Sequence, residues 1–205
     1  MSSRIVTLPN VLTVVRMALI PVFVGALYYQ RFGWALLIFV AAGATDALDG
    51  LFARKFNQWS QLGQILDPIA DKLLLVTSFI TLSMPSIMAP SALGPPHPRH
   101  LPVPFWVTAA VISRDVFIVV GAATINIVTG FKGFRPSQLG KINTFVQITA
   151  IVLVLVAAGF PPLRGYLPTV YTTVFAFAVV SGAHYVFWTS KLLNEDRAHR
   201  DSSQP

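Results

Sequence analysis

Six apolar segments, each long enough to cross a lipid bilayer, constrain the fold of this chain more than any other feature. The hydrocarbon core of a bilayer is about 30 Å thick, and a helix needs about 20 apolar residues to span it. Segments of suitable length lie at 8–29, 33–52, 64–84, 104–129, 140–159 and 168–190. We therefore predict an all-α, polytopic membrane protein with six transmembrane helices, forming one membrane domain at 1–190 and followed by a short cytoplasmic tail at 191–205.

The composition supports a membrane protein and excludes several kinds of chemistry. Only 11% of the residues are charged, whereas soluble domains carry about 25%. The net charge of +7 indicates basic loops beside anionic lipid rather than nucleic-acid binding. The absence of cysteine excludes disulfides, thiol catalysis and cysteine-ligated zinc. Seven residues precede the first apolar segment, which is too short for a transit peptide, so we expect a retained first span and a bacterial plasma membrane.

The distribution of Lys and Arg predicts the orientation, because basic residues collect in cytoplasmic loops. If the N-terminus is cytoplasmic, nine basic residues lie inside and three outside. The inner set is Arg4, Arg54, Lys55, Lys132, Arg135, Lys141, Lys191, Arg197 and Arg200, and the outer set is Arg31, Arg99 and Arg164. We expect both termini, and the turn between the second and third spans, at the cytoplasmic face.

Four of the eight acidic residues lie in the hairpin formed by the second and third spans: Asp46, Asp49, Asp67 and Asp71. One pair is three residues apart and the other four, so each pair shares one face of a helix. A carboxylate beside hydrocarbon is costly and needs a partner, and four converging carboxylates require cations. Oxygen ligands favour Mg²⁺, Mn²⁺ or Ca²⁺ over zinc. Because such ions at an interface chiefly serve phosphates, the hairpin predicts a metal site that binds a phosphate-bearing ligand.

Neighbours of the second aspartate fit the same chemistry. Gly50 removes a side chain where a bulky ligand approaches the helix. Arg54, one turn further on, is able to bind a phosphate in a bidentate manner. A carboxylate that is not required to hold metal is able to accept a proton from an attacking hydroxyl.

Two charged positions inside the spans leave two interpretations open. Arg16 lies one to two turns inside the first span and either snorkels to the interface or contacts a phosphate within the bundle. Arg114 and Asp115 interrupt the fourth span. They form either an ion pair that mutes both charges, or a site in which Arg114 contacts an anion.

The hairpin carries a motif with fixed gaps, D-x2-D-G-x2-A-R-x8-G-x3-D-x3-D, from residue 46 to residue 71. It resembles the signature of the CDP-alcohol phosphatidyltransferases at every specified position. The resemblance extends to LPNVLTVVRMALIP near the N-terminus, and six spans agree with that family's fold. It implies a membrane enzyme that transfers a phosphatidyl group from CDP-diacylglycerol to an alcohol and releases CMP.

The resemblance also implies roles for individual positions. Asp46, Asp49 and Asp67 correspond to ligands of two Mg²⁺ or Mn²⁺ ions, and Asp71 corresponds to a further ligand that accepts the proton. The positions around CDP-diacylglycerol are Asn10, Asp46, Asp49, Gly50, Ala53, Arg54, Ser60 and Gly63. The acceptor hydroxyl would attack the phosphorus on the diacylglycerol side directly, in agreement with the absence of cysteine and of a Ser-His arrangement. Related enzymes imply a homodimer, with membrane lipids and no nucleic acid as partners.

Two other stretches of the sequence indicate which alcohol is the acceptor. VISRDVFIVVGAA at 111–123 and GKINTFVQ at 140–147 resemble the eukaryotic-type cardiolipin synthases. The related bacterial phosphatidylglycerophosphate synthases typically have Arg-Glu and a second Arg eight residues later, where this chain has Asp115 and Ala122. We therefore favour phosphatidylglycerol as the acceptor, with glycerol-3-phosphate as the alternative and inositol phosphate or serine as weaker ones. The candidates for binding the acceptor's phosphate are Arg114, Lys132, Arg135 and Lys141.

A cation transporter is the alternative from another functional class, because acids inside a membrane also mark ion pathways. The acids here are confined to one hairpin, whereas transporter repeats would place them in two halves of the chain. Gly50 and Arg54 also have no clear role in a transporter. A structural scaffold would leave the four aspartates unexplained.

Overall fold

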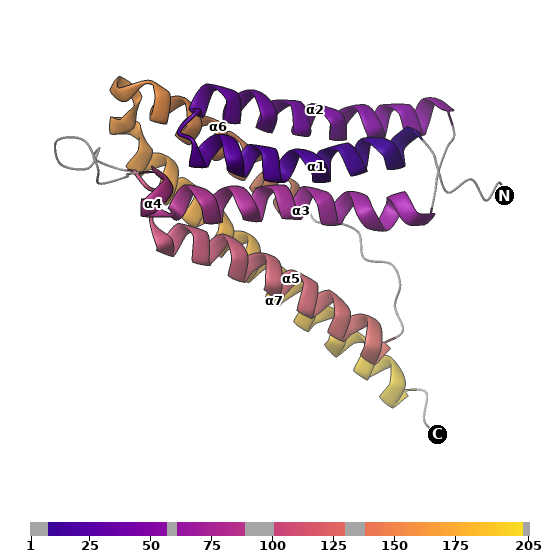
Figure 1. Cartoon of the computed structure of the whole chain (residues 1–205). Coiled ribbons are helices and arrows are strands. Elements are labelled where there is room, and N and C mark those ends of the chain that lie inside the picture. The colour runs from indigo at the N-terminus through magenta and orange to yellow at the C-terminus, as the bar shows by residue number, and fades with distance from the viewer. Residues whose placement is uncertain (1–7, 57–60, 89–100, 130–137, 203–205) are drawn as a thin grey trace. The chain divides into compact units, whose positions relative to one another are not determined.

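The computed structural model describes residues 8–56, 61–88, 101–129 and 138–202, and the backbone in these ranges is helical apart from short connections (Figure 1). The helices are α1 (Leu8–Tyr28), α2 (Phe32–Phe56), α3 (Gln61–Ser83), α4 (Pro85–Met88), α5 (Phe105–Thr129), α6 (Gln138–Gly159), the 3-10 helix η1 (Pro161–Tyr166) and α7 (Leu167–Ser202). The described ranges contain no strand. The all-α fold class is therefore confirmed, and each predicted span overlaps one long helix.

Three stretches of helix are long and apolar enough to cross a membrane: Val11–Tyr28, Gln138–Gly159 and Pro161–Phe187. Phe32–Thr45 is a shorter apolar helix. The first half of α3 contains Asp67, Asp71 and Lys72, which lower its hydropathy. The described residues thus support a membrane protein, while the number of six spans and the cytoplasmic position of both termini stay predictions.

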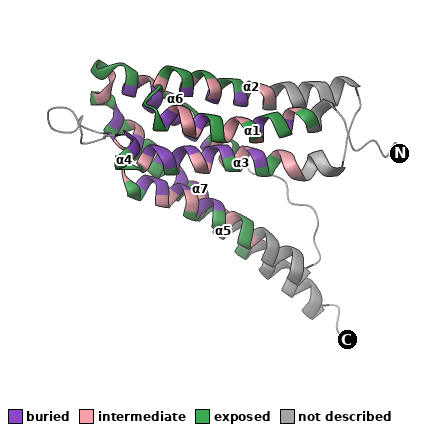
Figure 2. Cartoon of the chain, in the orientation of Figure 1, coloured by how far each residue is buried: buried purple, intermediate pink, exposed green. Residues whose placement is uncertain are grey.

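The chain divides into two compact units, of which the first holds the residues up to Pro104 and Ile151–Leu167. Within it, α1 packs against both α2 and α3 (Figure 1). The buried residues of α1 are Thr13, Arg16, Phe23 and Leu27 (Figure 2), and their spacing places them on one helical face. The ring of Phe23 packs against Phe39 of α2, with the ring centroids 5.9 Å apart.

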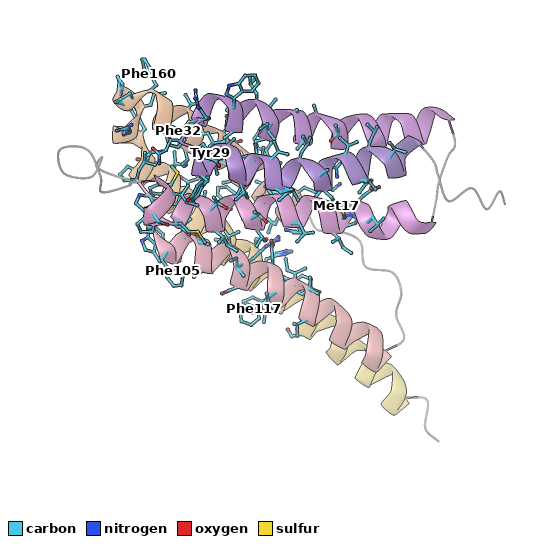
Figure 3. The ribbon with its side chains drawn as sticks, viewed as in Figure 1. Met17, Tyr29, Phe32, Phe105, Phe117 and Phe160 are labelled. Carbon is cyan, nitrogen blue, oxygen red and sulfur yellow. The ribbon has the colours of Figure 1, made fainter. Side chains whose placement is uncertain are left out.

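The turn between α1 and α2 is closed by Gln30, which has a φ of 59°, in the left-handed region that few residues other than glycine adopt. Its backbone N–H donates to the carbonyl of Leu27 at 2.9 Å. Its side-chain amide donates to the carbonyl of Ile87, which ties the turn to α4. Tyr29 and Phe32 lie on either side of this turn (Figure 3).

The second unit holds Phe105–Ala150 and the residues from Pro168 onward. Helices α5 and α7 pack through Trp106 and Phe175, whose rings meet edge to face at 5.2 Å. They also meet at Gly121, where a Cβ atom would lie 2.8 Å from the ring of Tyr185. Phe105 and Phe117 point away from α5 (Figure 3) and are 80% and 65% exposed. Large exposed apolar side chains of this kind are typical of a surface that faces lipid.

Helix α7 is longer than the predicted span at 168–190, because it continues without a break to Ser202. Its last part contains Lys191, Leu192, Leu193, Glu195, Arg197 and Ala198. Most of these residue types have high helix propensities, which favours continuation of the helix beyond the apolar segment. Most of the predicted tail is therefore an extension of α7.

Candidate active site

The four aspartates of the motif lie on two helices of the first unit, Asp46 and Asp49 on α2 and Asp67 and Asp71 on α3. The side chains of Asp67 and Asp71 are described. Those of Asp46 and Asp49 lie outside the described side chains, together with those of Asn10, Gly50, Ala53, Arg54, Ser60 and Gly63. The described half of the candidate site is therefore the half on α3.

Helix α1 supplies a hydrogen-bonding partner to each aspartate of α3. The Thr13 hydroxyl donates to Asp67 Oδ1. Arg16 Nη1 donates to Asp71 Oδ1 at 2.6 Å, forming an ion pair. Thr13 and Arg16 are fully buried, whereas the Asp71 side chain is 41% exposed. Because the two contacts occur in the same order along both helices, α1 and α3 run in the same direction.

The contacts explain why a charged residue is tolerated in the first apolar segment. Arg16 lies inside the membrane-length stretch Val11–Tyr28 and is 0% exposed, so the snorkelling interpretation is wrong. Its guanidinium instead points at the Asp71 carboxylate, and a charge-assisted bond of this kind is stronger than a neutral one. Sequence reasoning missed Thr13 and Arg16 as partners of the aspartates. The available signal was that a cation inside an apolar span needs a counter-charge.

Asp67 and Asp71 lie one helical turn apart and offer oxygen ligands, which are the donors that Mg²⁺ and Mn²⁺ prefer. An ionised carboxylate has about four lone-pair sites, so its bond to α1 is compatible with a cation at the same carboxylate. Among the described residues, no group of three His, Cys, Asp or Glu side chains lies close enough together to hold a metal ion. The ligand set predicted from the motif also includes Asp46 and Asp49, which lie on α2.

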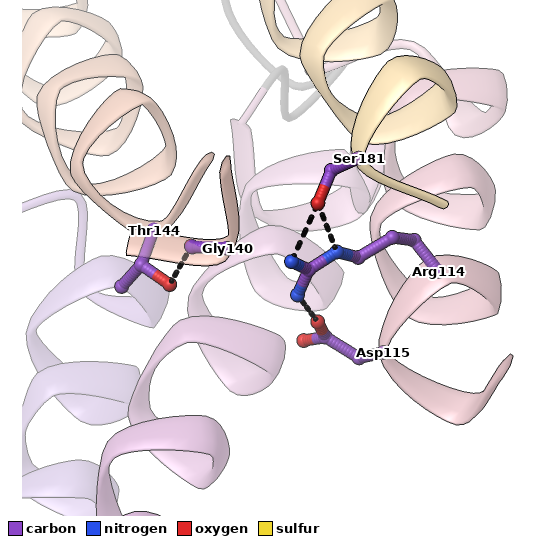
Figure 4. A network of polar contacts seen from close by, with 5 residues as sticks. All are labelled: Arg114, Asp115, Gly140, Thr144 and Ser181. Carbon is purple, nitrogen blue, oxygen red and sulfur yellow. Dashed lines mark hydrogen bonds and ion pairs between the residues drawn. The ribbon is translucent and has the colours of Figure 1, made fainter. Parts of the chain in front are cut away.

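In the second unit, the Arg114 guanidinium forms hydrogen bonds with the side chains of Ser181 and Asp115 (Figure 4). Its Nε and Nη2 atoms donate to Ser181 Oγ at 3.2 and 2.7 Å. Its Nη1 atom donates to Asp115 Oδ1 at 2.8 Å. Arg114 and Asp115 are 6% and 8% exposed. Of the two interpretations left open for this pair, the ion pair is the one observed, and Ser181 is a partner that sequence reasoning did not identify.

Of the other proposed acceptor residues, the structure describes only Lys141. Lys141 lies in the first turn of α6 and is exposed. Lys132 and Arg135 lie outside the described residues. One turn further along α6, the Thr144 hydroxyl donates to the carbonyl of Gly140 at 3.2 Å (Figure 4), which is a bond within the helix itself.

Comparison with known proteins agrees with the motif. A sequence model described as CDP-alcohol phosphatidyltransferase matches residues 6–188, which is most of the chain. The match includes α1, both helices of the aspartate hairpin, and the Arg114 network.

Curated relatives carry two names. The chain is 29% identical to "Cardiolipin synthase (CMP-forming)" of Streptomyces coelicolor over 94% of this chain and 82% of the relative. It is 34% identical to "Probable phosphatidylglycerophosphate synthase" of Mycobacterium tuberculosis over 90% of this chain and 82% of the relative. It is 31% identical to "Cardiolipin synthase (CMP-forming)" of Homo sapiens over 87% of this chain and 60% of the relative.

Proposed function

The chain belongs to the CDP-alcohol phosphatidyltransferase family, and from that membership we propose that it transfers the phosphatidyl group of CDP-diacylglycerol to phosphatidylglycerol, forming cardiolipin and CMP. The family makes the protein a transferase of phospholipid synthesis rather than a cation transporter. The identity of the acceptor is the part of the proposal that needs its own argument.

The observation that carries the choice of acceptor is the network around Arg114. Asp115 and Ser181 together engage three nitrogens of the guanidinium, and the position eight residues after Arg114 is Ala122 rather than a cation. A small dianionic acceptor such as glycerol-3-phosphate needs concentrated positive charge. Phosphatidylglycerol carries one phosphodiester charge and is held in the bilayer by its acyl chains, so it needs less. The Arg114 network therefore favours the lipid acceptor.

The second candidate is phosphatidylglycerophosphate synthesis from glycerol-3-phosphate. It is favoured by the 34% identity to the Mycobacterium tuberculosis relative of that name. The two activities share the donor and the leaving group, and they differ only in the alcohol.

We assign the proton transfer to Asp71. The acceptor's hydroxyl oxygen forms a bond to the phosphorus that carries the diacylglycerol, and the bond between that phosphorus and the bridging oxygen of the CMP moiety breaks. CMP leaves with the bridging electrons, and the hydroxyl proton passes to the Asp71 carboxylate. Arg16 binds one oxygen of that carboxylate, which fixes the orientation of the base before the substrate arrives.

We assign two Mg²⁺ or Mn²⁺ ions to Asp46, Asp49, Asp67 and Asp71. Such ions, when bound, neutralise the charge that develops on the phosphates of the leaving group. Thr13 donates to Asp67 and so orients one ligand, as residues around a metal site commonly do. In this proposal Arg54 binds a donor phosphate, and Asn10 and Ser60 line the CDP moiety. Gly50 leaves room for that moiety, and Ala53 and Gly63 keep the helices close to it.

The proposed setting is a bacterial plasma membrane crossed six times, with both termini and the active site at the cytoplasmic face and with a homodimer as the assembled form. The nine inner and three outer basic residues support this orientation. A headgroup at that interface reaches Asp67 and Asp71 while its acyl chains stay in the bilayer.

One assay separates the two candidate functions. The purified protein is incubated with CDP-diacylglycerol and Mn²⁺, with phosphatidylglycerol and glycerol-3-phosphate offered in separate reactions, and the lipid product is identified by mass spectrometry. We expect cardiolipin and CMP in the first reaction. Phosphatidylglycerophosphate as the sole product would overturn the choice of acceptor, and a reaction without enzyme gives the background of donor hydrolysis.

The Arg16–Asp71 ion pair gives a prediction about activity and stability. Arg16→Met removes the partner that orients Asp71, so we expect turnover to fall about 10- to 100-fold. The free energy of unfolding should fall by about 2 kcal/mol, because a hydrogen bond to a charged group is lost. Arg16→Lys keeps the charge without the planar fork and should recover part of both losses. CMP release and thermal unfolding in detergent measure the two effects, and an unchanged turnover in Arg16→Met would contradict the orienting role.

A further inference from the structure

One end of the first unit carries five exposed aromatic side chains that have no role in the reaction proposed above. They lie in the turn between α1 and α2 and on both sides of η1. Each is between 56% and 74% exposed, and together they form what we call the aromatic cluster: Tyr28, Tyr29, Trp34, Phe160 and Tyr166. Tyr29 and Phe160 lie at the same end of the unit (Figure 3).

The three membrane-length stretches all begin or end at this cluster. Val11–Tyr28 ends within it, Gln138–Gly159 ends one residue before Phe160, and Pro161–Phe187 begins one residue after Phe160. The end of a membrane-length apolar stretch lies near the boundary between hydrocarbon and headgroups. Tyr and Trp collect at that boundary, because their rings are apolar and their tips polar. The position of the cluster therefore indicates a membrane interface.

The charged residues at this end of the unit are basic. Arg31 lies exposed in the turn between α1 and α2, and Arg164 lies in η1. None of the eight acidic residues of the chain lies in the segments 28–34, 84–88 and 160–166. A surface with guanidinium groups and no carboxylate complements the phosphates of anionic lipid headgroups.

Hydrogen bonds and ring contacts hold the cluster in place. Arg164 donates from Nε to the carbonyl of Ala157 at 3.0 Å and from Nη2 to the carbonyl of Ala158 at 2.9 Å. These bonds fix η1 against the end of α6. The rings of Tyr28 and Tyr29 meet edge to face, with centroids 5.5 Å apart. The surface is therefore formed before any lipid binds to it.

We propose that Arg31 and the aromatic cluster bind the headgroup layer of the bilayer, with the Arg31 guanidinium on the phosphate of an anionic phospholipid. This contact holds the first unit at a fixed level in the membrane. Arg16, which binds Asp71, lies twelve residues before Tyr28 on α1, or about 18 Å along the helix axis. A headgroup at Arg31 is therefore distinct from a substrate at Asp71, and the inference does not depend on which alcohol is the acceptor.

Spin labels measure the depth of this surface directly. The chain contains no cysteine, so one introduced cysteine is the only labelling site. A Cβ atom at Gly33 or Gly165 would meet no further neighbour within 4 Å, so Gly33→Cys and Gly165→Cys should fold. Val22→Cys is the control, because Val22 is exposed and lies about 9 Å before Tyr28 along α1. In liposomes, collisions with oxygen and with a water-soluble nickel complex should place the labels at 33 and 165 among the headgroups and the label at 22 in the hydrocarbon.

Nanodiscs of two compositions test the contact between Arg31 and lipid. Phosphatidylserine is anionic without being the proposed acceptor, and adding it to phosphatidylcholine should raise the thermal unfolding midpoint of the wild type. Arg31→Gln should lose about 2–4 °C of that rise, whereas Arg31→Lys keeps the charge and should retain most of it. Arg200→Gln is the matched control, near the end of α7 and beyond the last apolar stretch, and should respond as the wild type does. Both KM values should be unchanged in Arg31→Gln.

Four results would overturn the proposal. Labels at 33 and 165 that meet the nickel complex as freely as in water would exclude the membrane contact. Dipolar broadening between labels at position 33 on two chains would mean that a second copy covers the surface. An Arg31→Gln variant with the full response to phosphatidylserine would exclude the phosphate contact, and a raised KM for CDP-diacylglycerol in that variant would indicate a substrate site instead. If the wild type makes no cardiolipin, the proposed function fails, and the label depths still decide this inference.

Discussion

Replacing Asp71 by asparagine is expected to lower kcat about 1,000-fold, because the variant has no carboxylate to accept the proton of the attacking hydroxyl. General base catalysis typically contributes 10²- to 10⁴-fold, and the chain offers no cysteine as an alternative nucleophile. Asparagine has nearly the shape of aspartate, and its carbonyl oxygen still accepts the hydrogen bond from Arg16. The fold and the binding of CDP-diacylglycerol should therefore be largely retained. The rate of CMP release measures kcat, and equilibrium binding of CDP-diacylglycerol measures the affinity for the donor.

Asp201→Asn is the matched control for this experiment. It makes the same chemical change near the end of α7, outside the motif, and should have wild-type turnover. If Asp71→Asn turned over at the rate of the wild type, the assignment of the base would be wrong. If it lost donor binding as completely as turnover, Asp71 would act mainly as a ligand.

Removing divalent metal is expected to abolish CMP release, and Mg²⁺ or Mn²⁺ should restore it. The carboxylates of Asp67 and Asp71 lie one turn apart on α3, and without cations they would repel the phosphates of the donor. Asp67→Asn should raise the metal concentration for half-maximal activity about 100-fold. Thr13→Val, which removes only the hydrogen bond to Asp67, should raise it about tenfold, as expected for a residue that orients a ligand.

The order of these two effects is the sharper part of the metal prediction. Because Asp67 binds the metal in this account and Thr13 only orients Asp67, the metal concentration for half-maximal activity of Thr13→Val should lie between those of the wild type and Asp67→Asn. Full activity in EDTA would contradict a metal role altogether. An Asp67→Asn variant with unchanged metal dependence would remove Asp67 from the ligand set.

Much of the fold follows from local properties of the sequence. The lengths of the apolar segments predict the helices, and α1 and α5 follow their predicted ranges closely. The end of α7 was missed because hydropathy locates the membrane boundary, whereas helix propensity decides where the helix ends. The gap between Asp67 and Asp71 likewise determines that they share one face of α3.

The contacts between helices could not be predicted in the same way. Thr13 and Asp67 are 54 residues apart in the sequence, and Arg114 and Ser181 are 67 apart. Periodicity indicates which face of a helix is buried, and it does not indicate which residue of another helix lies opposite. Arg16 illustrates the limit, since its position required a partner but did not identify Asp71.

The most direct test of the account follows the acceptor's glycerol into the product. The purified protein receives CDP-diacylglycerol, Mn²⁺, phosphatidylglycerol with a ¹³C-labelled headgroup glycerol, and an equal amount of unlabelled glycerol-3-phosphate. The account predicts one CMP released for each cardiolipin formed, with the label in the glycerol that joins its two phosphates. Unlabelled phosphatidylglycerophosphate as the only product, or no release of CMP with either alcohol, would contradict it.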